Sequence, residues 1–233
     1  MIVALVACGL LLSGCVFVKI KDGGITKSGE KIAGNGIISE KTFEVEDFSR
    51  IKLNVPADVT YSVADTPSMV VKVDENLMEY LTVSVSDGTL KIGSTGASFR
   101  NFKKLAITLS STALERLDCD GAVDFVSEGV IRGESFKMEV NGAADVEIPD
   151  LDVKSASFEI NGAGDLEVNL LDADKVSLEI SGAGDADLTG SAREVKVTVN
   201  GTGDVDLTRL QYETLDKKVN GVGSVKTAKQ SRL

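Results

Sequence analysis

The C-terminal half of the chain repeats a short motif, and this repeat constrains the fold more than any other feature. Each copy runs from an apolar residue through Asn or Ser, Gly, a variable residue and a small residue to a polar one, as in Ile160-Asn-Gly-Ala-Gly-Asp165. The leading glycines follow in steps of 20, 20, 19 and 20 residues, and a degenerate copy precedes them at Gly121. They are Gly142, Gly162, Gly182, Gly201 and Gly221. A constant period of this length is typical of units that stack on one another.

Apolar and polar side chains alternate on both sides of each turn. Phe158 and Ile160 precede one turn, and Leu166 and Val168 follow it, with polar residues between them. Alternation with period two predicts half-buried strands rather than helix. Within the turn, glycine makes a positive φ cheap, and Asn and Asp tolerate left-handed geometry and bond local backbone. The chain is therefore predicted to be all-β.

Two architectures fit these strands. Asn-Gly between alternating strands is a hairpin signal, which would give an antiparallel meander. The turn motif occurs once per unit, however, so we favour a right-handed parallel β-helix with one coil per repeat of about 20 residues. Equivalent residues then stack about 4.8 Å apart in interior columns. One column would hold Ile160, Ile180, Val199 and Val219, and another Leu166, Ala186, Val205 and Val225.

Residues 42–115 are less regular than the repeats of residues 116–233. Asn54-Val-Pro-Ala-Asp-Val59 aligns with the repeat segment that begins at Asn141, and Asp87-Gly88 is a tight-turn signal between alternating strands. Glu75-Asn-Leu-Met-Glu-Tyr-Leu81 reads as a short helical or irregular insertion. This region is expected to form either degenerate coils or a β cap that covers the open end of the helix.

The N-terminal segment is predicted to direct export. Residues 1–14 are apolar and uncharged, and they are too short to span a bilayer, which needs about 20 residues. The run Leu12-Ser-Gly-Cys15 resembles the lipobox of bacterial lipoproteins, which implies cleavage before Cys15 and lipid on that cysteine. Because Lys and Arg are missing at the extreme N-terminus, the true start lies upstream of Met1 or the signal is atypical. Residues 15–41 are expected to hold the lipidated Cys and a tether.

The remaining cysteines fit this scheme. Cys8 leaves with the signal, so Cys119 is the only thiol without a predicted role in export or anchoring, and its alternating surroundings predict a buried packing residue. Val16, in place of Asp after the lipidated position, favours the outer membrane, with periplasmic or surface exposure left open.

Charge and residue types exclude several functions. A formal net charge of −11 argues against nucleic-acid binding, because few cations are available for phosphates. The absence of His removes Ser-His-Asp and Cys-His nucleophilic chemistry and the usual zinc ligands.

The lipobox, an entry stretch from Phe43 to Val63, Leu90-Lys-Ile92 and the stacked Asn-Gly-x-Gly-Asp units resemble the head GIN domain of putative autotransporter adhesins. The resemblance covers roughly residues 40–225 and implies an exported, often lipid-anchored bacterial protein with a right-handed β-helical fold. It implies no catalytic residues.

A parallel stack would turn single carboxylates into columns. Like charges about 5 Å apart repel by roughly 1 kcal/mol per pair in water, so solvent, backbone amides or a cation must offset the repulsion. The first column is Asp145, Asp165, Asp185 and Asp204, the second is Glu147, Glu167, Asp187 and Asp206, and the third is Glu139, Glu159 and Glu179.

These columns admit three interpretations. The simplest is a solvated acidic face in which the Asp side chains cap turn backbone. The second is weak Ca²⁺ binding at the four aspartates of the first column, since hard carboxylate oxygens suit that ion. The third is glycosidase-type paired carboxylates, which is disfavoured because every carboxylate belongs to a repeat. The stacked Asn141, Asn161, Asn200 and Asn220, interrupted by Ser181, predict an amide ladder.

Taken together, these features predict a non-enzymatic cell-envelope lipoprotein that acts as an adhesin-like binding or scaffold module. No cofactor is expected. The expected partners are the membrane, through the lipid anchor, and an unidentified glycan or envelope protein. The alternative is a β-helical carbohydrate-active protein, either a polysaccharide binder or a lyase or hydrolase.

Overall fold

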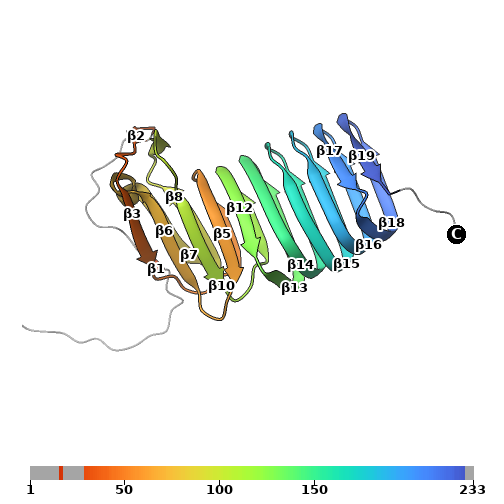
Figure 1. The fold of residues 1–233 in the computed structure, drawn as a ribbon, viewed down its shortest axis with the longest axis horizontal. Coiled ribbons are helices and arrows are strands. Elements are labelled where there is room, and N and C mark those ends of the chain that lie inside the picture. The colour runs from red at the N-terminus through yellow and green to blue at the C-terminus, as the bar shows by residue number, and fades with distance from the viewer. Residues whose placement is uncertain (1–15, 18–28, 229–233) are drawn as a thin grey trace, which may run out of the picture.

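The computed structural model describes residues 16–17 and 29–228, which form an elongated stack of strands (Figure 1). From β12 onward the colours run in order along the stack to β18 and β19 at one end, whereas orange β5 lies beside green β12, beyond the yellow-green strands β7 and β8. The strands build a β-solenoid of about six turns with stacked parallel coils.

Each regular coil has a straight segment before the Asn-Gly turn, here called the entry side, and one after it, the exit side. Long strands such as β14 run from the exit side of one coil, round a bend, to the entry side of the next. The strands of this region are β11 (Arg116–Cys119), β12 (Ala122–Glu128), β13 (Val130–Val140), β14 (Ala143–Ile160), β15 (Leu166–Ile180), β16 (Ala186–Val199), β17 (Thr202–Leu207), β18 (Leu210–Val219) and β19 (Val222–Thr227).

Parallel pairing confirms the predicted β-helix and excludes the meander for the repeats. Ile160 pairs in register with Ile180, and the column continues through Val199 to Val219. On the exit side Leu166 stacks with Ala186, Val205 and Val225, as predicted. Val219 keeps its place in the column but is 41% exposed, because no further coil covers it within the described residues.

The last coil also departs from the apolar pattern. Lys217 pairs in register with Val197 and so occupies a position that is apolar in the preceding coils. Its ammonium reaches the other side of the coil, where Nζ donates to the carbonyl oxygen of Val225 at 3.4 Å. A charged group therefore lies across the C-terminal end of the core.

Both expectations for residues 42–115 hold, each for different strands. β4 (Arg50–Leu53) and β5 (Ala57–Val63) pair in parallel with β11 and β12 and so belong to the coils. The other strands form a cap with antiparallel pairs: β3 pairs with β6, β6 with β10, β1 with β7, and β7 with β8. The cap is joined to the coils by two parallel pairs, β8 with β4 and β10 with β5. Their bounds are β1 (Val16–Phe17), β3 (Ile38–Phe43), β6 (Ser68–Asp74), β7 (Leu81–Ser86), β8 (Thr89–Ser94) and β10 (Ala106–Ser111).

The irregular elements lie within this cap. The predicted insertion is a 3₁₀ helix, η1 (Glu75–Tyr80), and Asp87 and Gly88 both have positive φ in the tight turn between β7 and β8. β2 (Lys31–Ala33) pairs with β9 (Ser98–Arg100) in a small parallel sheet. Strands β1 and β2 and the start of β3 fall within residues 15–41, so part of the segment assigned to the tether belongs to the cap.

The leading glycines of the motif are required by close stacking, not by a left-handed backbone as predicted. A Cβ on Gly182 would lie less than 3.0 Å from the carbonyl oxygen of Gly162, and one on Gly201 would meet the carbonyl oxygen of Gly182 in the same way. Within these turns only Gly164 and Gly203 have positive φ. The turn is therefore conserved from coil to coil because backbone packs on backbone.

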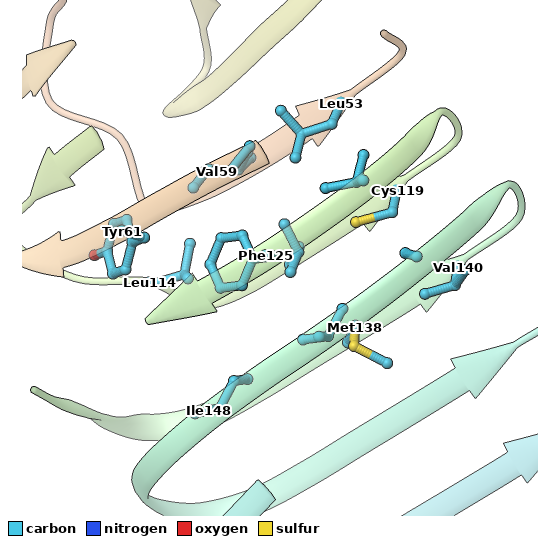
Figure 2. Close-up of a cluster of buried hydrophobic side chains, with 14 of the residues drawn as sticks. Leu53, Val59, Tyr61, Leu114, Cys119, Phe125, Met138, Val140 and Ile148 are labelled. Atoms are coloured by element: carbon cyan, nitrogen blue, oxygen red, sulfur yellow. The ribbon is translucent and has the colours of Figure 1, made fainter. Parts of the chain in front are cut away.

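The core runs along the whole stack. Figure 2 shows Cys119 between Leu53 and Val140, three side chains that stack in register from successive coils. Phe125 stacks on Tyr61 from the neighbouring coil, with ring centroids 6.2 Å apart. Each of these five side chains is at most 1% exposed, so this part of the interior is closely packed and mainly apolar.

Burial should make the thiol of Cys119 unreactive towards alkylating agents in the folded protein. Desolvation, with the charges of Asp118 and Asp120 adding to it, raises the pKa of its thiol to about 12, so the thiolate that reacts with alkylating agents is scarce at pH 8. We expect the chain with Cys8→Ser and Cys15→Ser to react with iodoacetamide only in denaturant. Rapid labelling of Cys119 in buffer would show that the coil around it opens readily.

Candidate binding surface

The first acidic column is longer than predicted. Asp58 of β5 and Asp124 of β12 stack in register with Asp145, so the column spans both the cap-proximal coils and the regular repeats. It continues through the three remaining predicted aspartates. The complete column is Asp58, Asp124, Asp145, Asp165, Asp185 and Asp204.

Backbone amides stabilise the regular part of this column. Asp145 Oδ1 accepts a hydrogen bond from the amide of Asp165 at 3.3 Å, Asp165 Oδ1 from Asp185 at 3.0 Å, and Asp185 Oδ1 from Asp204 at 2.7 Å. The sequence predicts that each carboxylate caps the backbone of its own turn. Instead, each of these three carboxylates accepts a hydrogen bond from the backbone of the next coil. These bonds offset the like-charge repulsion and tie successive coils together.

Within the part of the chain that the structure describes, cations form ion pairs with the exit side near its two ends. Lys104 pairs with Asp58 beside the cap, and Arg209 and Lys226 pair with Asp187 and Asp204 near the C-terminal coil. Between them, no ion pair forms within the described residues to the side chains of Asp124, Asp145, Asp165, Asp185, Glu147 and Glu167. The middle of the exit side is therefore a strongly negative surface.

The four aspartates predicted as cation ligands lie in one column but do not gather around one point. Within residues 16–17 and 29–228, no three acidic or cysteine side chains are close enough to share a metal ion. The column geometry is that of a ladder, in which each carboxylate already accepts a backbone amide.

The entry side carries a balanced set of charges. Glu139, Glu159 and Glu179 stack in register as predicted. Arg116 Nη2 lies 2.8 Å from Glu139 Oε2, and Lys137 Nζ lies 2.9 Å from Glu159 Oε1. This third column is therefore partly neutralised, unlike the exit side.

The predicted amide ladder is confirmed beside these charges. Asn161 Nδ2 donates to Asn141 Oδ1 at 3.2 Å, and Asn220 Nδ2 donates to Asn200 Oδ1 at 2.7 Å. Ser181 interrupts the series, and there Asn200 donates to Glu179 instead. Because the amides of the ladder bond one another from coil to coil, we assign the ladder a structural role.

Ion pairing on the entry side makes part of the stability depend on pH. The hydrogen bond from Lys52, 2.7 Å from the carboxylate, lowers the pKa of Asp120. The hydrogen bond from Asn141, followed by the charge of Arg116, lowers the pKa of Glu139. A carboxyl whose pKa is lower in the folded state stabilises the fold above its unfolded pKa, and this contribution is lost as the pH falls through the folded value.

We therefore expect acid to weaken the fold below about pH 4.5, with each carboxyl contributing about 1 kcal/mol or less because both are partly solvated. Asp120→Asn should reduce the difference in unfolding free energy between pH 7 and pH 3, measured by urea titration. In a Lys52→Met background the same substitution should have a smaller effect. An identical effect in both backgrounds would show that the ion pair is not the source.

A cleft of about 540 Å³, here called the cap cleft, lies where the cap meets the coils. The segment that links β9 to β10 forms one wall with Phe102, Lys103 and Lys104. The opposite side is formed by turn residues of small side chain and by the first members of the acidic column, namely Ala122, Ala143, Ala163, Asp58, Asp124 and Asp145.

The sequence prediction missed this cleft. Its wall comes from Asn101-Phe-Lys-Lys104, which lies outside the repeat and was given no role. Two adjacent lysines next to an aromatic residue, in a chain of net charge −11, are the signal that could have drawn attention to it. Their approach to Asp58 and Asp124, however, depends on the antiparallel cap, which the sequence did not specify.

The other predicted site residue, Cys15, lies outside the described residues. No helix within the part of the chain that the structure describes is both long and apolar enough to cross a bilayer.

Comparison with solved structures agrees with the architecture. A putative adhesin from Parabacteroides distasonis ATCC 8503 is 26% identical, with a TM-score of 0.80 over 85% of this chain and 84% of that chain. A putative adhesin from Bacteroides fragilis NCTC 9343 is 19% identical, with a TM-score of 0.66 over 84% and 99%. A putative lipid binding protein from Parabacteroides distasonis ATCC 8503 is 19% identical, with a TM-score of 0.58 over 86% and 100%. The latter two show the shared fold alone.

No curated protein matches the chain at a significant level. The family model described as "Putative auto-transporter adhesin, head GIN domain" matches residues 47–233, which include the coils, most of the cap and both acidic columns of the exit side. The chain therefore belongs to this family, the head GIN domain of putative auto-transporter adhesins.

Proposed function

We propose that this protein is a non-enzymatic, adhesin-like binding module, held at the cell envelope by a lipid anchor on Cys15. The observation that carries the proposal is the continuity of the exit side, where outward side chains stay in register from β5 to β19. Such a surface suits an extended partner better than a small substrate. Membership of an adhesin family suggests a cell-envelope or surface location.

A binding assay tests this function directly. The purified full chain should bind saturably to bacterial envelope fractions or to an immobilised glycan panel without converting what it binds. Turnover of any polysaccharide, or failure to bind either preparation, would contradict a non-enzymatic adhesin.

The anchor is supported by the sequence Leu12-Ser-Gly-Cys15, and Val16 supports the outer membrane as its destination. Expressing cells fed an alkyne fatty acid should label the protein, and Cys15→Ser should abolish both the label and recovery in the outer-membrane fraction. Cys119→Ser is the matched control and should keep both. Label retained in Cys15→Ser would exclude this anchor.

The cap cleft favours a second candidate, a carbohydrate-active protein, because it brings lysines from outside the repeat next to Asp58 and Asp124. Release of reducing ends from a polysaccharide library, lost in Asp124→Asn, would support catalysis. Absence of turnover leaves the cleft available for binding alone.

A further inference from the structure

The wall of the cap cleft is fixed by buried contacts. Asp74 is fully buried, and its carboxylate accepts hydrogen bonds from the amides of Gly36 and Lys103, the latter at 3.3 Å. On the other side of the segment, the amide of Asp58 donates to the carbonyl oxygen of Leu105 at 2.9 Å. The segment is therefore held at Lys103 and at Leu105, and a ligand would meet a preformed wall, which lowers the entropic cost of binding.

The cleft offers a flat apolar side and a polar side. Phe102 is partly exposed, and Phe99 packs edge-on against it, with ring centroids 6.1 Å apart, so the orientation of the Phe102 ring is set. Ala143 and Ala163 form a bridge between coils and add a shallow apolar floor. An aromatic ring above small side chains is a surface on which the apolar face of a pyranose ring can lie.

Hydrogen-bonding groups surround this apolar surface. The side chain of Asp124 makes no hydrogen bond or ion pair with the described residues, although its charge contributes to the raised pKa of Lys104. Asp145 uses one carboxylate oxygen for the amide of Asp165 and keeps lone pairs on the other. Lys103 is exposed at the rim. Carboxylates accept from sugar hydroxyls and ammonium groups donate to them, so both kinds of partner are present.

Charge selects among possible sugars. Lys104 is already paired with Asp58, whereas Asp124 and Asp145 are unpaired and lie at the edge of the acidic exit side. This negative surface would repel the carboxylate of a uronic or sialic acid, whereas it would not repel an uncharged sugar. The volume of about 540 Å³ falls in the usual range of about 300–1,000 Å³ for small-ligand pockets.

We infer that the cap cleft is a binding subsite for an uncharged oligosaccharide, with Phe102 as the stacking platform and Asp124, Asp145 and Lys103 as hydrogen-bonding partners. The inference rests on the proposed adhesin function and specifies the chemical class of its partner. The rest of the glycan would extend from the cleft along the exit side.

Isothermal titration calorimetry of the full chain, in a detergent without a sugar headgroup, tests this subsite. The probes are cellotetraose, maltotetraose and fully N-acetylated chitotetraose, all uncharged, with tetragalacturonate as the anionic comparison. At least one uncharged probe should bind, and tetragalacturonate should bind about tenfold more weakly or not at all. If only tetragalacturonate binds, or if no probe binds, the inference is wrong.

Variants separate the cleft from the remainder of the surface. Phe102→Ala and Asp124→Asn should each weaken binding of the uncharged probe about tenfold while leaving the unfolding transition in place. Asp172→Asn, at an exposed position of β15 outside the cleft and the acidic columns, should leave the affinity unchanged. Equal affinities for all variants would place the sugar elsewhere and overturn the inference. Envelope binding that persists while no sugar binds would reject the subsite and leave the adhesin function standing.

Discussion

Replacing Gly182 with alanine should lower the free energy of unfolding by about 3 kcal/mol or more. The new Cβ would overlap the carbonyl oxygen of Gly162, which itself accepts a hydrogen bond from the amide of Ala183 at 2.9 Å. Relieving the overlap requires two coils to separate, which breaks this bond and opens the core beneath it. Urea denaturation followed by circular dichroism measures the change.

Gly133→Ala is the matched control. The nearest atoms to a Cβ there belong to the backbone of Ser135, at 3.9 and 4.0 Å, and Gly133 is exposed within a strand. Because alanine also restricts the unfolded chain, this variant should be neutral or more stable by up to about 1 kcal/mol. If Gly182→Ala were as stable as Gly133→Ala, close stacking of the turns could not be the reason for glycine.

Phe158→Ala should cost about 3–5 kcal/mol. Phe158 is fully buried in the middle of the entry side, stacked between Met138 and Leu178, and its ring lies 6.2 Å from that of Phe136. Its neighbours are fixed by hydrogen bonds to the coils on either side, so they cannot collapse into the cavity. The same urea titration reports the loss.

Phe158→Leu provides the comparison, because leucine occupies the equivalent position of the next coil at Leu178. It should cost about 1–2 kcal/mol, well below the alanine variant. Val126→Ala, on the outer face and 38% exposed, should change stability by less than about 1 kcal/mol. Equal losses for all three would indicate that the coils unfold independently of this core.

The regular coils could be predicted from the sequence because the alternation of apolar side chains and the constant spacing of the turns indicate the same architecture. The alternation around Ile160 and Leu166 defines which side chains point inward, and the constant step between turns defines which coil each one meets. The role of glycine in the turn was harder to predict. Positive φ and close approach both select glycine, and only the distance between Gly182 and Gly162 distinguishes them.

The cap and its cleft could not be predicted in the same way. Strands β3, β6 and β7 carry the same alternation as the coils, so their pattern alone does not separate antiparallel from parallel pairing. The contact between Lys104 and Asp58 joins the segment between β9 and β10, which lies outside the repeat, to strand β5. The acidic column was predicted correctly for the repeats, and the match of Asn54–Val59 to the motif already indicated that Asp58 belongs to it.

Lys217 affects whether a second molecule can stack on the C-terminal coil. A stack of near-identical units has no intrinsic end, since each last unit is a template on which another molecule could grow into a fibre. By laying an ammonium group across that template, Lys217 makes any such addition bury a charge against a carbonyl and apolar side chains. A charged side chain at this position of the last described coil therefore disfavours end-to-end stacking of one molecule on another.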